Sequence, residues 1–258
     1  MKNTLSTVHK ALQVLQEISN DINNEVSVSN LAERLGYPKS VTHRLVTSLV
    51  QDKFLEQDPI SKKYSIGYRS FLVGIKYRSF DRLSSIAEPY IMSMIAELNK
   101  PCSSYIGVLD DTDVVFLSVF FASKPIRIES AKQGEHRPVH TTALGKSILA
   151  KLSTNEFNSL VRRIEFTPMT SNTIVDIDRL QKEIDIIKQR GYAIADQESL
   201  EGVTSVGAAI APSRLLLSGF SISIPSIIVT KDLIMTLGNA IQVTANKIEQ
   251  AVRDYYLI

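Results

Sequence analysis

The 258-residue sequence predicts an α+β protein built from a small domain and a larger one. Apolar residues recur at helical spacing three times within residues 1–53, and a hairpin pattern follows. From Ser103 the pattern changes to strands, which are predicted within residues 103–131 and 192–224. Helical patterns separate these strands and close the chain. We therefore expect a mainly antiparallel sheet in the larger domain.

The composition excludes several classes of protein. The single cysteine, Cys102, rules out an intrachain disulfide and a four-cysteine zinc site, and we expect it to be a structural thiol. The N-terminus lacks the apolar core of a signal peptide, and the most apolar stretch, residues 215–229, is too short to span a bilayer. We expect a soluble cytoplasmic protein with no cofactor and no membrane partner.

Positive charge is concentrated near the N-terminus. Residues 34–80 hold nine Lys/Arg and three Asp/Glu, whereas the whole chain carries a formal net charge of only +2. A basic block beside a mildly acidic body suggests one module that faces nucleic acid and one that does not. Ordinary charge fluctuation is the alternative.

The first two helical patterns are short and clearly delimited. The first runs from Thr7 to Ser19 and the second from Val28 to Leu35. Gly36 follows the second helix, where a left-handed C-cap is easiest for glycine. Pro38 suits the first turn of a third helix. This tight connection predicts a helix-turn-helix.

The third helix, residues 39–53, has an apolar face and a polar face. Thr42 falls on the apolar face, so we do not expect it to contact bases. The polar face carries a cation, an imidazole and short hydroxyls, with almost no acid. Such groups suit phosphates and base edges in a DNA major groove, with Lys39 nearer the backbone. The residues expected to enter the groove are Ser40, His43, Arg44 and Thr47.

A hairpin pattern follows the third helix. Residues 54–57 and 62–66 are predicted strands, joined by a turn at residues 58–61. Together with the helices, the hairpin predicts a winged helix-turn-helix over residues 1–66, with Lys62 and Lys63 at flanking phosphates. A helical cap on an enzyme and a winged helix that binds protein are the alternatives.

A linker helix over residues 67–82 is expected to join this domain to a second one, residues 83–258. The next helix, predicted from Arg82 to Asn99, holds Pro89, which we expect in its first turn. The strands predicted in the second domain are 104–109, 114–121, 126–131, 192–195, 203–211 and 215–224, and the helices are 141–152, 177–190 and 232–255.

Short motifs in the second domain point only weakly to chemistry. Gly145-Lys146-Ser147 lacks the earlier glycine of a phosphate-binding loop. His136 and His140 lack a third soft ligand for a metal ion. The acids at residues 196–201 favour a polar loop over a catalytic pair. We expect no catalytic residue and no metal site.

Motifs in both domains resemble, in the same order, those of the IclR-type (isocitrate lyase regulator) transcription factors. The resemblance covers nearly the whole chain, and the ordered set is more specific than any one motif. The matching segments are Ala11–Leu15, Leu31–Gly36 and Pro38–Leu45 in the first domain, and His140–Lys146, Arg190–Ala193 and Ser221–Ser223 in the second.

This resemblance implies a ligand-responsive transcriptional regulator that acts as a repressor. It implies a homodimer or a dimer of dimers (a homotetramer), bound to a pseudo-palindromic double-stranded DNA operator. It also implies a GAF-like C-terminal domain for effector binding and oligomerisation. The effector would be a small metabolite such as an organic, sugar or aromatic acid, with its carboxylate at a helix N-terminus. The alternative is an enzyme of small-acid metabolism with an appended winged-helix interaction module. Carried over by motif, the effector-binding residues are Ala143, Leu144, Asp196, Ser205, Ser221 and Ser223.

Overall fold

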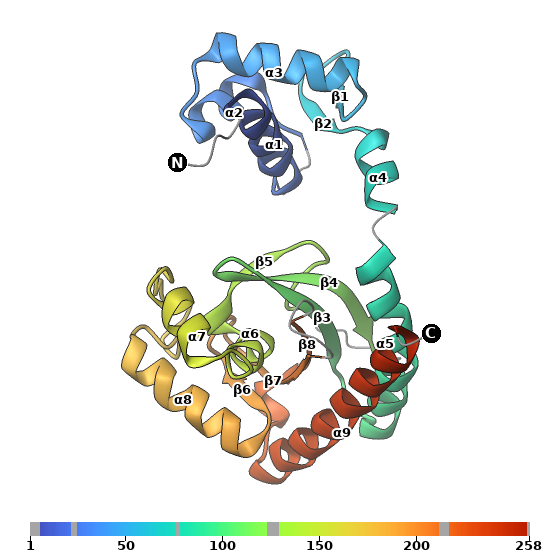
Figure 1. Ribbon diagram of the computed structural model, residues 1–258, viewed down its shortest axis with the longest axis vertical. Helices are drawn as coiled ribbons and strands as arrows, with labels where there is room; N and C mark the ends of the chain where they lie inside the picture. Colours follow the sequence, from blue (N-terminus) through green and yellow to red (C-terminus); the bar gives the residue numbers. More distant parts are fainter. Residues whose placement is uncertain (1–5, 22–24, 76–77, 123–128, 212–216, 257–258) are drawn as a thin grey trace. The chain divides into compact units, whose positions relative to one another are not determined.

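The chain folds into two compact units, Met1–Arg78 and Ser79–Ile258, in a computed structural model (Figure 1). The predicted α+β class is confirmed, since both units contain helices and the second contains an antiparallel sheet. Among the described helices, none has the length and apolar character needed to cross a membrane. The structure describes residues 6–21, 25–75, 78–122, 129–211 and 217–256.

The first unit is the predicted winged helix-turn-helix. Ser27 caps α2 by accepting a hydrogen bond from the N–H of Asn30, and Gly36 ends the helix with φ 65°, as expected. Pro38 occupies the N-cap of α3, one residue before the predicted first turn. The elements are α1 (Ser6–Ser19), α2 (Val28–Leu35) and α3 (Lys39–Gln51), with a wing formed by the antiparallel strands β1 (Leu55–Gln57) and β2 (Tyr64–Ile66).

The described part of the predicted linker is helical on both sides of residues 76–77, which lie outside the described residues. Helix α4 (Tyr68–Ile75) precedes them and α5 (Arg78–Leu98) follows them, so α5 starts earlier than the predicted helix at Arg82. Pro89 therefore lies inside α5, and its predicted place in the first turn was wrong. An interior proline removes one helical hydrogen bond. The helix continues because buried side chains on both sides of the proline, including Leu83 and Ile95, hold it against the sheet.

The second unit is built on a sheet whose order, within the described residues, is β5-β4-β3-β8-β7-β6 with antiparallel pairing throughout. The strand predicted at 126–131 is not confirmed: residues 126–128 lie outside the described ones, and 129–131 form no strand. Strand β5 and helix α7 were not predicted. The strands are β3 (Ser103–Asp110), β4 (Asp113–Phe121), β5 (His136–Pro138), β6 (Ala193–Asp196), β7 (Val203–Ile210) and β8 (Ser218–Pro225).

Helices cover both faces of this sheet (Figure 1). Helices α5 and α9 pack on one face, while α6, α7 and α8 lie over the other. Side chains alternate between the faces along each strand, so Ser221 and Ser223 point toward α6, whereas Phe220 and Ile222 point toward α9. The remaining elements are η1 (Val139–Thr141), α6 (Ala143–Leu149), α7 (Thr154–Val161), α8 (Ile177–Arg190), η2 (Ser226–Ile228) and α9 (Lys231–Tyr256).

Candidate DNA interface and ligand cavity

Helix α3 divides into the two faces that its sequence predicts. Thr42 is fully buried, and its hydroxyl donates to the carbonyl oxygen of Pro38. The sequence of α3 contains no acidic residue. Its exposed side is therefore an uncompensated basic and hydroxyl surface. The exposed residues of this surface are Lys39, Ser40, His43, Arg44, Thr47 and Ser48.

The wing turn is held in shape by Asp58. Its Oδ1 atom accepts hydrogen bonds from the N–H of Ser61 (2.6 Å) and of Ile60 (3.0 Å). The bonds from Ser61 hold the pKa of Asp58 below its ordinary value. Lys62 and Lys63 are exposed beside this turn.

The two wing lysines differ in their surroundings. The Nζ atom of Lys63 lies 3.9 Å from Oε2 of Glu25, so part of its charge is balanced. Among the described residues, no carboxylate lies within ion-pair distance of Lys62. Elsewhere in this unit, the Nη1 atom of Arg34 lies 2.9 Å from Oδ2 of Asp21 and 3.3 Å from Oε1 of Glu17. One cation of the basic block at residues 34–80 is thus paired with carboxylates of its own domain.

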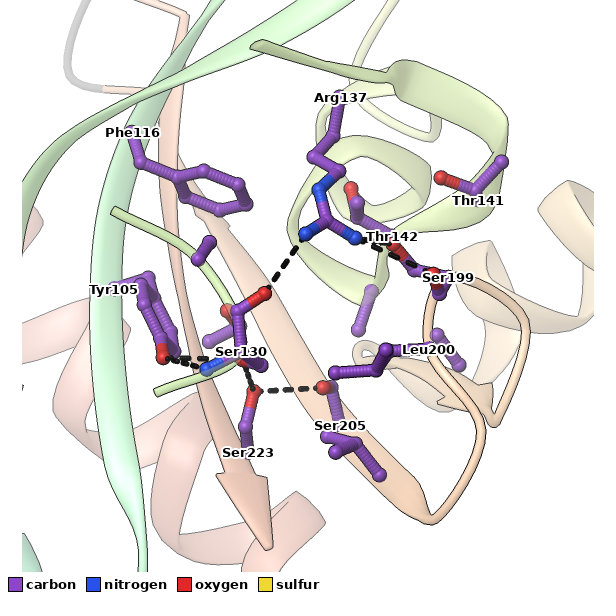
Figure 2. A pocket seen from close by; sticks show the side chains of 15 residues that line it. Tyr105, Phe116, Ser130, Arg137, Thr141, Thr142, Ser199, Leu200, Ser205 and Ser223 are labelled. Atoms are coloured by element: carbon purple, nitrogen blue, oxygen red, sulfur yellow. Dashed lines mark hydrogen bonds between the residues drawn. The ribbon is translucent and has the colours of Figure 1, made fainter. Parts of the chain in front are cut away.

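A small cavity lies between α6 and the sheet of the second unit (Figure 2). Its volume is about 40 Å³, which corresponds to roughly three water molecules. Tyr105 and Phe116 form an aromatic wall, with ring centroids 5.3 Å apart. Most of the polar lining groups are hydroxyls. They belong to Ser130, Thr142, Ser199, Ser205, Ser221 and Ser223, among others.

Hydroxyl groups at one side of the cavity form a connected chain (Figure 2). The Oγ atoms of Ser205 and Ser223 are 2.8 Å apart. The Oγ atom of Ser130 lies 3.4 Å from that of Ser223 and 3.0 Å from the phenol oxygen of Tyr105. Because each hydroxyl can donate and accept, the chain can rearrange to suit a polar ligand.

Arg137 is the charged residue of this cavity, among the described residues that line it, and the sequence did not point to it. Its Nε donates to Oε1 of Glu135 (2.6 Å) and its Nη2 to the carbonyl oxygen of Ser130 (2.9 Å). Its Nη1 donates to Oγ (2.8 Å) and to the carbonyl oxygen (3.3 Å) of Ser199. The guanidinium therefore bridges two segments that border the cavity (Figure 2).

Two carried-over residues, Leu144 and Asp196, do not line this cavity. Leu144 is fully buried, and its Cδ1 lies 3.3 Å from where a Cβ on Gly107 would be. Asp196 is exposed and accepts a hydrogen bond from Thr204. Since side chains alternate along β6, it points away from the face on which Ala195 lines the cavity. The carried-over residues that do line it are Ala143, Ser205, Ser221 and Ser223.

Helix α6 begins beside the cavity, and its first turn is already partly capped. The Oγ1 atom of Thr142 accepts a hydrogen bond from the N–H of Gly145 (2.9 Å). Gly207 lets the start of α6 approach the sheet, because a Cβ there would lie 2.7 Å from the carbonyl carbon and oxygen of Ala143. The close approach of α6 to β7, beside the cavity, thus depends on this glycine.

A buried ion pair lies on the same helix. The Nζ atom of Lys146, which is fully buried, lies 2.6 Å from Oε1 of Glu198. Burial raises the pKa of Glu198, although Lys146 opposes that shift. Among the described residues, Oε2 of Glu198 and both ring nitrogens of His140 have no hydrogen-bond partner. Burial, together with the charge of Lys146, lowers the pKa of His140 to about 4. The Gly145-Lys146-Ser147 motif is thus a core segment.

The surroundings of the cysteine and the histidines explain the other residues considered as nucleophiles or metal ligands. Cys102 is buried, which raises the pKa of its thiol to about 11 and keeps it protonated at neutral pH. His136 is exposed on β5, whereas His140 is buried. In the described part of the chain, no group of three or more His, Cys, Asp or Glu side chains is placed to hold a metal ion.

Comparison with known proteins assigns both units. A model of the IclR helix-turn-helix domain matches residues 20–59, and a model of the bacterial transcriptional regulator IclR C-terminal domain matches residues 77–250. The chain belongs to the IclR family. The first model spans α2, α3 and β1, and the second spans α5 and the whole sheet. The α+β architecture is therefore that of an IclR-family transcriptional regulator.

Curated relatives of this IclR-family chain are named as regulators. The transcriptional repressor IclR of Escherichia coli K12 is 26% identical over 248 residues, covering 96% of this chain and 90% of the relative. The HTH-type transcriptional regulator KdgR of Dickeya chrysanthemi is 25% identical over 230 residues, covering 89% and 74%. The protein is accordingly a transcriptional regulator of this family, and the comparisons give the enzyme alternative no support.

Solved structures support the same fold. An IclR-type regulator from Silicibacter sp. TM1040 has a TM-score of 0.84 at 20% identity, covering 96% of each chain. An IclR homologue from Microbacterium hydrocarbonoxydans, complexed with 4-hydroxybenzoate, has a TM-score of 0.80 at 20% identity. The match covers 96% of this chain and 100% of that chain.

Proposed function

We propose that this IclR-family protein is a repressor whose operator binding is controlled by a small acid bound in the cavity beside α6. The observation that carries this proposal is the cavity itself, which combines a hydroxyl chain, an aromatic wall and one arginine. Two further facts support it: a curated relative is named a repressor, and a structural homologue is complexed with 4-hydroxybenzoate. The effector residues of this proposal are Ala143, Ser205, Ser221 and Ser223.

The DNA contacts are proposed for the exposed surface of α3 and for the wing. An α-helix fits the major groove, and the side chains of this surface suit base edges and phosphates. Lys62 would contact a flanking phosphate more strongly than Lys63, whose charge Glu25 partly balances. The proposed groove residues are Ser40, His43, Arg44 and Thr47, with Lys39 at the backbone.

The proposed assembly is a homodimer, or a dimer of dimers, on a pseudo-palindromic operator. Two copies of a helix-turn-helix placed by a two-fold axis contact two half-sites, which makes the operator symmetric. We assign DNA binding to residues 1–66, the linker to 67–82, and effector binding and oligomerisation to 83–258. The compact units divide within that linker, at Arg78.

Control of DNA binding requires that the effector bind two forms of the assembly with different affinities. The segment that joins the two units, α4 and α5, is the proposed route of this coupling. The test is a titration of operator DNA with the full chain, with and without small carboxylic acids. We expect an acid to weaken operator binding. Operator affinity that no bound acid alters would contradict control by this cavity.

A further inference from the structure

Arg137 is a largely buried cavity-lining arginine held by several hydrogen bonds. Its side chain is 15% exposed, and its acceptors come from three separate places: Glu135, Ser130 and Ser199. Ser199 is 62 residues away in the sequence. Figure 2 shows the guanidinium between the Ser130 and Ser199 segments, on the side of the cavity opposite Ser223 and Ser205. A ligand in the cavity therefore lies between a cation and a chain of hydroxyls.

The hydrogen bonds of Arg137 leave room for a ligand. A guanidinium has five N–H donors, and the bonds to Glu135, Ser130 and Ser199 use four of them. One N–H on Nη2 thus has no acceptor among the described residues. The bond to the carbonyl oxygen of Ser199, at 3.3 Å, is the longest of the four. A ligand oxygen can take the place of that acceptor at small cost.

We infer that Arg137 binds the carboxylate of the effector, through the unpaired N–H of Nη2 and in place of the carbonyl oxygen of Ser199 on Nη1. A carboxylate can accept two parallel bonds from a guanidinium, which makes this pairing both strong and specific. The inference rests on the proposed control by a small acid. It differs in placing the carboxylate at Arg137 and not at the start of α6, where Thr142 already caps the helix.

The opposite side of the cavity specifies the rest of the ligand. The hydroxyls of Ser130, Ser205 and Ser223 can donate to and accept from a ligand hydroxyl. A volume of about 40 Å³ admits only a few heavy atoms while the bond from Arg137 to the Oγ of Ser199 is kept. The ligand class that meets both conditions is a short 2-hydroxy acid. Larger acids would require the Ser199 segment to move.

A substitution at Glu135 can separate the effect of charge on acid binding from the effect of hydrogen-bond geometry. It accepts from Nε of Arg137 at 2.6 Å and is 31% exposed, so it orients the guanidinium and also competes with a ligand anion. Glu135→Gln keeps an oxygen acceptor for Nε but removes the negative charge. The inference therefore predicts opposite effects for two neighbours: Arg137→Gln weakens binding of an acid, and Glu135→Gln strengthens it.

The experiment is isothermal titration of the full chain with the two enantiomers of lactate and with glycolate, each beside its neutral amide. We expect a lactate or glycolate to bind and its amide to bind roughly tenfold more weakly or worse. Arg137→Gln should reduce the acid to the affinity of the amide, and Glu135→Gln should increase acid affinity several-fold. Arg163→Gln, which removes an exposed arginine paired with Asp111, is the matched control and should change nothing.

A second variant shows whether the loss of acid binding in Arg137→Gln could come from a folding defect. Arg137→Lys keeps the charge but not the paired donors, so it should fall between the wild type and Arg137→Gln. The inference is overturned by unchanged acid affinity in Arg137→Gln, by equal binding of acid and amide, or by failure of these acids to bind at millimolar concentration. Operator titration distinguishes it from the proposed function. Lactate binding that depends on Arg137 without any change in operator affinity would uphold the site and contradict the control of DNA binding.

Discussion

Arg44 is the side chain of the exposed α3 surface best suited to recognise a base, because its planar guanidinium can bond a guanine bidentately. Arg44→Ala should weaken binding to a selected operator by about 1–3 kcal/mol and should lower affinity for random DNA much less. Fluorescence anisotropy on both DNAs measures the difference. An equal loss on both would instead place Arg44 at a phosphate. Arg162→Ala, an exposed arginine of the second unit, is the control.

His140 predicts a specific loss of stability in acid. Its pKa falls from an ordinary 6.5 to about 4 in the folded protein, so the native state holds the neutral ring. The neutral ring therefore contributes to the free energy of unfolding in full above about pH 6.5. This contribution is lost as the pH falls through about 4, by about 1.4 kcal/mol per pH unit and by about 3 kcal/mol at most.

The comparison that isolates this effect is His140→Phe, because the ring of His140 packs against Phe166 with centroids 5.0 Å apart. Urea unfolding from neutral pH to about pH 4 should show the wild type losing about 3 kcal/mol more than the variant. Parallel pH profiles for the two proteins would mean that His140 is not held neutral by the fold.

At the scale of elements, the approach of α6 to the sheet depends on Gly207. A Cβ there would lie 2.7 Å from backbone atoms of Ala143, which cannot yield as a flexible side chain would. Gly207→Ala should lower the free energy of unfolding by about 1–3 kcal/mol and weaken acid binding. Gly74→Ala is the matched control, since a Cβ at Gly74 meets open space within α4. That change should leave stability unchanged or raise it by about 0.5–1 kcal/mol. Equal effects of the two substitutions would contradict this role.

The wing should contribute a separable electrostatic part of DNA binding. Each phosphate contact contributes about 0.9 to the slope of log affinity against log salt. Lys62→Ala should therefore reduce that slope by about 0.9, and Lys63→Ala by less, because Glu25 lies 3.9 Å from its Nζ. Salt titrations of both variants measure these slopes, with Lys151→Ala in the second unit as control. A slope unchanged by both wing substitutions would remove the wing from the interface.

Helices and strands were predictable from the sequence where a pattern within the element itself indicates them. Helix α3 repeats its apolar residues at helical spacing, so the burial of Thr42 and the exposure of Arg44 follow from the sequence. Pro89 misled the prediction of α5, because a proline usually marks a helix start and tertiary packing overrides that signal here. Strand β5 has three residues, too few for alternation to be visible.

At the scale of the whole molecule, the site was only partly predictable. The resemblance carried Ala143, Ser205, Ser221 and Ser223 to the cavity, since family motifs preserve position. It could not place Arg137, whose role depends on segments brought together by folding and not on any local pattern. Leu144 and Asp196 do not line the cavity, because a motif groups neighbours in sequence, while a helix or strand directs consecutive side chains to different sides.

The measurement that tests the central claim most directly is selection of DNA from a random pool by the purified full chain, followed by a salt titration on the enriched sequence. The account predicts a pseudo-palindrome bound with a steep salt dependence, and weaker binding when a small acid is added. Repeating the selection with a mixture of small carboxylates covers a DNA-binding form that requires its effector. No enriched sequence under either condition, or binding that salt does not affect, would contradict the account and favour a winged helix that binds protein.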